Sequence, residues 1–410
     1  MAGDRYLKIG MIGGGMKSFM GGIHREAIEK VGNLKIVGGS FGTSRQASYD
    51  FIKPLGLNVD DLFPSYRDFL RRQKTRKGSD RILFASAILP NTMHYPIAMT
   101  AMDCGIPILG EKPFTSNLDE AANLVRKQRT TKVPYRIAMV YPAYSQLAKA
   151  KELLKDGAIG TIRRFHVSMQ SGWMARRVEN QGNTHALWRV DGKRNGVGGV
   201  LNDCGCHCQF VLEWLTGFEI SDVCVGARAC VPGRLIPDDA TVLVRTKQGV
   251  DGTFIMSQIA TGHNEGLTFE ITGDKGAMIW RQCEPGVLAI VGNDGRRKEF
   301  KDSTPSGDSG FEEVPYGANA AYVEALARVY ADFAESLAGK PGKKSKAKSS
   351  GVLGMTAEEG LRSVAVITAM EKSVQFVPPD APPAIKWQPV VMPKLEFAYV
   401  SGLTGVLSGR

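Results

Sequence analysis

The chain has 410 residues, more than one hydrophobic core usually supports, so we expect two domains. Hydrophobic residues make up 43% and charged residues 23% of it, which excludes a disordered chain. No stretch approaches the roughly 18 apolar residues that a membrane-spanning helix needs, so we expect no membrane partner. The first residues do not resemble a secretory signal, and we expect a cytoplasmic location.

The net charge of +11 is partly concentrated in one Gly/Pro/Ser-rich run that contains five lysines. We expect residues 338–351 to form a flexible basic loop. No aromatic platform or recognition motif accompanies this loop, so we expect no nucleic-acid partner. The seven cysteines are odd in number and widely spread. Their arrangement argues against a disulfide framework and favours reduced thiols.

Residues 6–12 predict a buried first strand that leads directly into three glycines. Gly13 and Gly15 form the G-x-G of a dinucleotide-binding turn, where missing side chains let the backbone approach a pyrophosphate at a helix N-terminus. The third position of the motif carries Ser18, which is small enough for close packing of helix on strand. We therefore expect Gly13, Gly15 and the adjacent Met16 to bind a cofactor.

Residues 34–39 predict the next strand, which ends roughly 20 residues further on, where the adenosine ribose is normally bound. No Asp or Glu stands there to bind the two ribose hydroxyls. Thr43, Ser44 and Arg45 either bind a 2′-phosphate or cap the next helix. The choice between NAD and NADP therefore stays open.

A third apolar segment, residues 81–85, leads to Leu89, Pro90, Asn91 and His94 at the same edge of the sheet. We expect this loop to line the nicotinamide ribose. The alternative is that Asn91 caps the next helix and His94 lies on its first turn. Helices alternate with short apolar strands throughout this half, which predicts a parallel sheet covered on both faces.

Glu111, Lys112 and Pro113 follow the apolar run 106–109 and precede another helix. A lysine at the carboxyl end of such a strand lies at the crevice where open α/β sheets bind ligands. We therefore expect Lys112 to face a cofactor; the alternative is a surface lysine at a strand end. A proline can also hold the preceding peptide bond in the cis form.

The second half of the chain has a different pattern. Alternating strands begin at 162–169 and recur in succession at 241–246, 253–260, 267–272 and 277–280, which predicts a mostly antiparallel sheet. We therefore expect an α/β protein with two domains. Residues 1–140 would form a Rossmann domain with a doubly wound parallel sheet, and residues 141–410 an α+β domain with a mostly antiparallel open sheet.

Asp203 and His207 are candidate acid–base residues. We expect Asp203 at the N-cap of a helix over 208–215 and His207 one turn later, so that one helix start presents both side chains to one site. A lone Asp-x-x-x-His is more often a capped helix with a packed histidine. The neighbouring glycines, the matching lysine and the cofactor motif favour the functional interpretation.

Three cysteines surround His207, namely Cys204, Cys206 and Cys208. They alternate too closely for the common C-x₂-C metal-binding pattern, and no second Cys/His cluster appears. We interpret them as small residues beside the site and expect no metal.

Taken in order, these motifs resemble the nicotinamide-dependent sugar and cyclitol dehydrogenases of the Gfo/Idh/MocA family, typified by glucose–fructose oxidoreductase and inositol 2-dehydrogenase. The match covers the chain to about residue 280 and rests on the glycine turn, Pro90-Asn91…His94, Glu111-Lys112-Pro113 and Gly198-Gly199…Asp203-x-Gly205-x-His207. The resemblance implies NAD as cofactor, with NADP not excluded, and a small carbohydrate or cyclitol as substrate. It also implies substrate binding by the second domain and a homodimer or homotetramer built on its free sheet face.

The resemblance also implies roles for single residues beside the reacting carbon. Glu111 and Lys112 match the family's signature triplet, in which the lysine touches both the cofactor and the reacting hydroxyl. Trp188 and Arg189 are expected at the cofactor. Trp173 either stacks on a sugar ring or belongs to the core.

The resulting hypothesis is a dehydrogenase that oxidises a secondary hydroxyl of a sugar, glycoside, anhydrosugar or cyclitol to a ketone by hydride transfer. His207 would accept the hydroxyl proton, and Asp203 would bind a neighbouring hydroxyl and orient His207. Lys112 would hold the reacting hydroxyl and stabilise the alkoxide, sharing the proton transfer if burial lowers its pKa. One alternative is an NAD-dependent glycoside-cleaving enzyme that uses transient oxidation with no net redox change. Another is a non-catalytic cofactor sensor, which would need no base.

Overall fold

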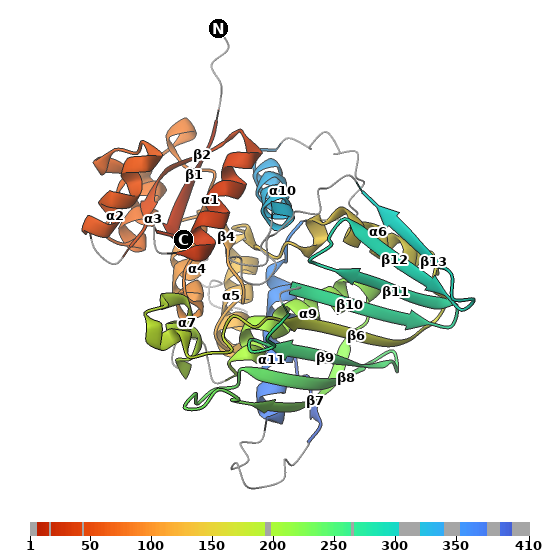
Figure 1. Ribbon diagram of the computed structural model, residues 1–410. Helices are drawn as coiled ribbons and strands as arrows, with labels where there is room; N and C mark the ends of the chain where they lie inside the picture. Colours follow the sequence, from red (N-terminus) through yellow and green to blue (C-terminus); the bar gives the residue numbers. More distant parts are fainter. Residues whose placement is uncertain are drawn as a thin grey trace, which may run out of the picture.

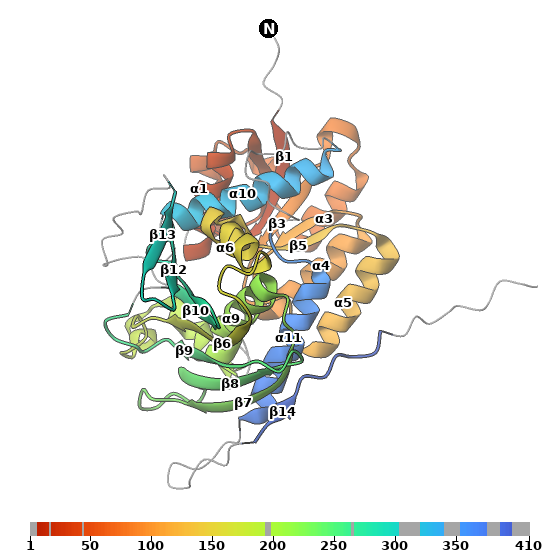
Figure 2. The ribbon, with the colours of Figure 1, turned by 90° about the vertical axis from the view of Figure 1, so that its right-hand side faces the viewer.

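The computed structural model describes residues 6–15, 18–42, 45–192, 198–263, 266–302, 320–339, 353–374 and 386–395. Met16, Thr43, Ser44 and the side chain of Arg45 lie outside the described part, as does nearly all of the predicted basic loop. The described chain forms two sheets with helices around and between them (Figure 1, Figure 2).

The N-terminal sheet is parallel and covered on both faces. Its strands are β1 (Leu7–Gly13), β2 (Leu34–Ser40), β3 (Phe84–Ile88), β4 (Ile108–Gly110) and β5 (Tyr135–Ile137). Their spatial order is β2-β1-β3-β4-β5, and every neighbouring pair is parallel. All five residues of β3 are buried, as expected of a central strand between two helical layers. The predicted Rossmann-type sheet is confirmed.

Five helices accompany this sheet: α1 (Phe19–Val31), α2 (Arg45–Ile52), α3 (Tyr66–Thr75), α4 (His94–Asp103) and α5 (Leu118–Thr131). A sixth comes from much later in the chain, because α10 (Ala320–Leu337) lies alongside α1 (Figure 2). The C-terminal part of the chain therefore returns to complete the N-terminal unit. The boundary at residue 140 stays a prediction.

The second sheet is large and mostly antiparallel. It contains β6 (Ile162–Gln170), β7 (Ile220–Arg228), β8 (Asp239–Thr246), β9 (Asp251–Ser257), β10 (Gly266–Gly273), β11 (Gly276–Arg281), β12 (Val287–Gly292), β13 (Arg297–Lys301) and β14 (Gln388–Pro389). The order is β13-β12-β11-β10-β6-β9-β8-β7-β14, and only the β6–β9 pair is parallel in the described sheet. Burial alternates along β8, so one face is covered. The predicted sheet type is confirmed.

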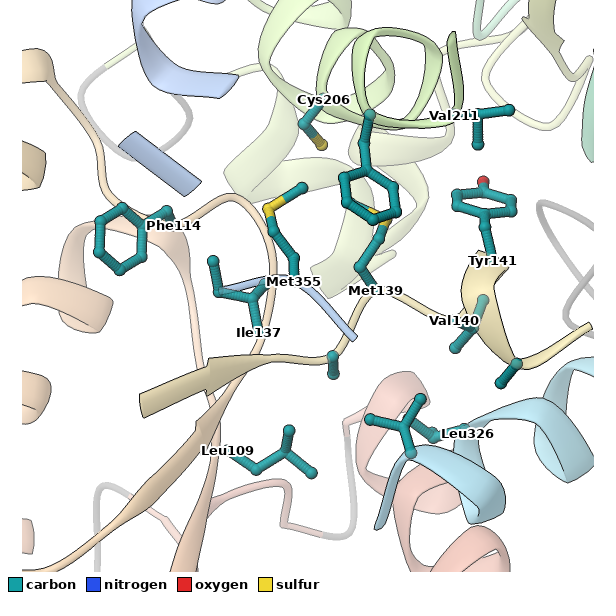
Figure 3. Packing of buried hydrophobic residues seen from close by; sticks show 14 of the residues in the cluster. Leu109, Phe114, Ile137, Met139, Val140, Tyr141, Cys206, Val211, Leu326 and Met355 are labelled. Carbon is teal, nitrogen blue, oxygen red and sulfur yellow. The ribbon is translucent and has the colours of Figure 1, made fainter. Parts of the chain in front are cut away.

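The covered face of this sheet packs against α6 (Ser145–Lys155), α9 (Val200–Thr216) and α11 (Ala357–Ser373) (Figure 1). A short helix, α7 (Thr184–Arg189), precedes α9. Figure 3 shows Leu109 and Ile137 of the first sheet, Cys206 and Val211 of α9 and Leu326 of α10 in one apolar cluster. The two halves therefore share a packed core, which holds their facing edges in fixed positions. Within the described ranges, no helix has the length and apolar character needed to cross a bilayer.

The helix that carries Asp203 and His207 begins earlier than predicted. Gly199 is its N-cap and Val200 its first residue, so Asp203 lies inside the first turn. Gly199 has φ 52°, and a Cβ there would lie 2.2 Å from the carbonyl oxygen of Pro237. Only glycine fits this entry to the helix. The N-cap prediction for Asp203 is therefore wrong, but Asp203 and His207 remain one turn apart.

Candidate active site

The turn between β1 and α1 is shaped for close approach of a ligand. Gly13 and Gly14 have φ values of 76° and 67°, in the region that favours glycine. A Cβ on Gly15 would lie 2.3 Å from the carbonyl oxygen of Phe41. A turn without side chains at a helix N-terminus is the usual cradle for a pyrophosphate. The predicted residues Gly13 and Gly15 therefore fit a dinucleotide.

At the third position of the glycine motif, Ser18 does not provide the close packing of helix on strand that we predicted. Ser18 is the N-cap of α1, and its hydroxyl accepts a hydrogen bond of 3.1 Å from the Gly21 amide. Gly21 is the residue that packs on the turn, since a Cβ there would lie 2.2 Å from the Gly14 carbonyl oxygen. Arg25 Nη1 donates to the same carbonyl at 2.7 Å. Close packing of α1 on the turn therefore depends on Gly21.

His94 joins the loops after β3 and β4. Its Nδ1 lies 2.6 Å from the carbonyl oxygen of Pro113, and its Nε2 lies 3.0 Å from that of Leu89. Burial lowers the pKa of His94. Each ring nitrogen thus faces a backbone carbonyl, and because a neutral imidazole carries one N–H, the ring donates to one of the two carbonyls at a time. The expected contact of this loop with the nicotinamide ribose stays a prediction. Asn91 is buried and does not cap α4, whose N-cap is Met93.

The side chains of Glu111 and Lys112 have different partners, namely His24 for Glu111 and Asp203 for Lys112. The peptide bond between Lys112 and Pro113 is cis. Glu111 Oε1 lies 2.7 Å from His24 Nε2, and Oε2 accepts a hydrogen bond of 3.2 Å from the Lys112 amide. Burial alone would raise the pKa of Glu111, but the hydrogen bond from His24 lowers it below its ordinary value. The carboxylate is therefore engaged inside the N-terminal unit.

The contacts of Glu111 extend into a buried network. His24 Nδ1 lies 2.6 Å from the hydroxyl of Tyr330, and that hydroxyl lies 2.5 Å from Ser86 Oγ. All four side chains are almost fully buried. The network links α1, β3, the end of β4 and α10. Sequence reasoning assigned no site role to His24, which lies in the segment after the glycine turn, or to Tyr330, which lies on an amphipathic helix far along the chain.

Asp203 receives hydrogen bonds from the side chains of Lys112, Arg189 and Gln258 in the described structure. Lys112 Nζ donates to Oδ1 at 2.8 Å, while Arg189 Nε and Gln258 Nε2 donate to Oδ2 at 2.9 and 3.0 Å. Burial would raise the pKa of Asp203, but the charges of Arg189 and Lys112 hold it well below its usual value. Burial would likewise lower the pKa of Lys112, but the Asp203 carboxylate raises it above its ordinary value. Lys112 is therefore cationic, which removes the expected condition for its sharing the proton transfer.

His207 lies one helical turn after Asp203, with its two ring nitrogens in different situations. Nδ1 lies 2.9 Å from the hydroxyl of Tyr141, whereas the buried Nε2 has no hydrogen-bond partner in the described part of the chain. Burial lowers the pKa of His207 well below its usual value, and the charge of Lys112 adds to this effect while Asp203 opposes it. The ring is therefore neutral near pH 7. Tyr141, not Asp203, makes the hydrogen bond that orients it.

Arg189 is flanked by two tryptophans. Its guanidinium carbon lies 4.1 Å from the centre of the Trp188 ring and 5.5 Å from that of Trp173. Both rings are partly exposed, and each lies near the Arg189 guanidinium, which in turn donates to the Asp203 carboxylate. The structure therefore gathers the residues predicted from the three segments around 173, 188 and 203.

Two residues at this site lacked a predictive signal strong enough to be used. Gln258 directly follows β9, and Tyr141 begins a turn after a three-residue connection from the end of β5. A polar residue at a strand end is common, so position alone did not single them out. Among the described residues, no group of three or more His, Cys, Asp or Glu side chains is arranged to hold a metal. Burial raises the pKa of the Cys206 thiol to about 12, so it is protonated at neutral pH.

Two protein-family models match the chain. The model described as the NAD-binding Rossmann fold of the oxidoreductase family matches residues 7–139. The GFO/IDH/MocA C-terminal domain model matches residues 147–279. The first range contains the glycine turn and Lys112, and the second contains Asp203 and His207, so the two models meet at the candidate site.

Individual relatives agree with these models. The uncharacterized oxidoreductase YfiI of Bacillus subtilis is 25% identical over 287 residues, which cover 69% of this chain and 72% of the relative. Levoglucosan dehydrogenase of Pseudarthrobacter phenanthrenivorans is 25% identical over 225 residues, which cover 49% of this chain and 56% of that enzyme. An inositol dehydrogenase homolog of Azotobacter vinelandii, solved with NAD+, has the same fold, with a TM-score of 0.79 and 23% identity over 90% of this chain and 96% of that one. This chain belongs to the GFO/IDH/MocA family of NAD-binding oxidoreductases.

Proposed function

We propose that this protein is an NAD(P)-dependent dehydrogenase that oxidises a secondary hydroxyl of a sugar, glycoside, anhydrosugar or cyclitol to a ketone. The observation that carries the proposal is the convergence of Lys112, Asp203 and His207 at the carboxyl ends of the strands of the NAD-binding sheet. Two of the relatives are named for levoglucosan and for inositol, both polyhydroxylated rings. That substrate class is consistent with a site that offers several polar groups and two aromatic faces.

The chain's own residues fit a bound dinucleotide. Gly13, Gly15 and the N-terminus of α1 would hold the pyrophosphate, and the loops after β3 and β4 would border the nicotinamide end. When bound, the nicotinamide supplies an acceptor for the hydride that leaves the substrate carbon. The protein must then remove the hydroxyl proton and stabilise the charge that develops on the oxygen.

Lys112 and His207 have complementary charge states for this task. The Lys112 ammonium, kept charged by Asp203, would donate to the reacting hydroxyl and stabilise the developing alkoxide. Neutral His207 would accept the hydroxyl proton at Nε2, the ring nitrogen that has no partner in the described structure. Asp203 would hold Lys112 in place and bind a neighbouring hydroxyl. Trp173 beside it would pack against the ring of the substrate.

The proposal is tested by supplying NAD and NADP separately with a panel of sugars, glycosides, anhydrosugars and inositols. Absorbance of the reduced cofactor is followed, and the ketone is then identified by mass spectrometry. We expect reduced cofactor to accumulate with at least one substrate, and we expect Lys112→Met to remove most of that turnover. Cleavage of a glycoside without net reduction would support the transient-oxidation alternative instead. If no substrate gives either reduced cofactor or a cleaved glycoside, the proposal is refuted.

A further inference from the structure

Tyr141 is a buried tyrosine to which the reaction proposed above assigns no role. It begins a short 3₁₀ turn (Tyr141–Ala143) that follows β5 where the N-terminal sheet meets α9. Figure 3 shows its side chain rising from this turn toward α9, beside Val211. The residue is 1% exposed. Arg328 Nη1 of α10 donates to the Ala143 carbonyl at 3.0 Å and holds the turn in place.

Two contacts of Tyr141 determine how the His207 ring is placed. Its hydroxyl oxygen lies 2.9 Å from Nδ1, and the two rings meet edge to face with centroids 5.6 Å apart at an interplanar angle of 90°. The edge-to-face contact restricts where the imidazole lies, and the hydrogen bond restricts its rotation. Because Nδ1 is occupied, Nε2 is the nitrogen left for a substrate.

The position of one hydrogen decides whether His207 can act as a base. A neutral imidazole carries a single N–H, on either of its two nitrogens. Nε2 has a lone pair for an incoming proton only when the hydrogen is on Nδ1. That tautomer needs a hydrogen-bond acceptor at Nδ1, and the Tyr141 oxygen is placed to be one. If Tyr141 instead donated to Nδ1, Nε2 would carry the hydrogen and could not accept another.

We propose that Tyr141 is a positioning residue that holds His207 in the Nδ1–H tautomer, so that the Nε2 lone pair faces the reacting hydroxyl. The choice of this tautomer rests on the proposed dehydrogenase function, in which Nε2 is the base, but the tautomer itself can be measured without turnover. After proton uptake the imidazolium still donates from Nδ1 to the same oxygen, so the bond persists through the reaction. Burial raises the pKa of Tyr141 well above its ordinary value, which keeps the phenol protonated and neutral.

The tautomer can be measured without any substrate. The chain contains six histidines, and nitrogen-15 labelling of their rings with NMR at neutral pH distinguishes protonated from unprotonated ring nitrogens. His207→Gln identifies the relevant signals. We expect protonated Nδ1 and unprotonated Nε2 in the wild type, and a mixture with the Nε2–H form in Tyr141→Phe. A protonated Nε2 in the wild type, or the same tautomer in both proteins, would overturn the inference.

The second measurement is kinetic. We expect Tyr141→Phe to lower kcat about 10- to 100-fold with a smaller change in KM. The reason is that part of the His207 population then carries its hydrogen on Nε2 and cannot act as the general base. The acid limb of the pH profile should also move to lower pH, since the imidazolium loses its acceptor while Lys112 and Asp203 still face the ring. Equal losses in Tyr141→Phe and in the control below would indicate a packing effect and contradict the inference.

Tyr144→Phe is the matched control, because Tyr144 is an equally buried tyrosine beside the same turn whose hydroxyl is not bonded to His207. We expect wild-type kcat, pH profile and His207 tautomer from this variant. If the wild type oxidises nothing in the panel, the proposed function fails, while the NMR result still decides the role of Tyr141.

Discussion

Glu111 and Lys112 are neighbours in the chain, but their side chains belong to two networks of opposite kind. In the Glu111 network both ring nitrogens of His24 are engaged, and the Tyr330 hydroxyl lies within hydrogen-bond distance of both His24 and Ser86. The open group consists of Lys112 and Asp203 together with His207, whose ring is affected by both charges, and there His207 Nε2 has no partner among the described residues. A buried polar atom without a partner is costly, so proteins keep few of them. The comparison indicates that the closed network stabilises the fold, and it supports the proposal that the open group of side chains receives a substrate.

The largest effect on turnover is expected from replacing Lys112, the cation of the open group. Lys112→Met removes the charge beside the reacting oxygen, and we expect kcat/KM to fall by about 10²- to 10⁴-fold. Asp203 keeps its contacts with Arg189 and Gln258, so the protein should remain folded. Fluorescence titration with reduced cofactor should give nearly wild-type affinity. Unchanged turnover would show that the open group is not the reactive one.

Breaking the closed network should instead change stability. His24→Ala leaves the buried Glu111 carboxylate without its side-chain partner, and we expect the free energy of unfolding to fall by about 3–5 kcal/mol. Urea denaturation measures this loss, and His24→Gln should show a smaller one because the amide still donates to Glu111. Turnover per folded molecule should fall far less than in Lys112→Met. Full stability with abolished turnover would reverse the assignment of the two networks.

A single hydroxyl in the closed network should have a smaller effect. Tyr330→Phe leaves Ser86 and His24 Nδ1 without that partner, and we expect a loss of about 1–3 kcal/mol in the free energy of unfolding. Tyr66→Phe is the matched control, because the buried Tyr66 hydroxyl makes no hydrogen bond within the described chain. It should unfold like the wild type. Equal losses in both variants would mean that the Tyr330 hydrogen bonds contribute little.

The smallest expected effect is on the pH dependence of oxidation, which reports the protonation of His207. Burial lowers the pKa of His207, so the ring stays unprotonated at pH values where an ordinary histidine would already be charged. We therefore expect kcat/KM to hold as pH falls through about 6.5, the ordinary value, and to decline only below it. A profile measured with a slow substrate checks this. An acid limb above the ordinary histidine pKa would contradict the assignment of His207 as base.

Much of the fold could be predicted because its signals are local. Alternating strands and helices predicted the parallel sheet, and successive alternating strands predicted the antiparallel one. The start of α9 was predicted wrongly, since Asp203 is a favoured N-cap residue type. The helix instead begins at Val200 with Gly199 as its N-cap, where the close carbonyl of Pro237 admits no side chain. That contact lies outside the range of any local pattern.

In the candidate site, too, some features follow from the sequence alone and others only from the tertiary structure. The four-residue spacing of Asp203 and His207 and the position of Lys112 after a strand are properties of the sequence alone, because helix and strand geometry carries them from residue to residue. Which atoms those side chains bind was decided by the tertiary structure. The partners lie 91 residues away for Lys112 and Asp203, 66 for Tyr141 and His207, and 306 for His24 and Tyr330. Hydrogen bonds across such separations depend on how packed elements meet, and they leave no mark on local spacing.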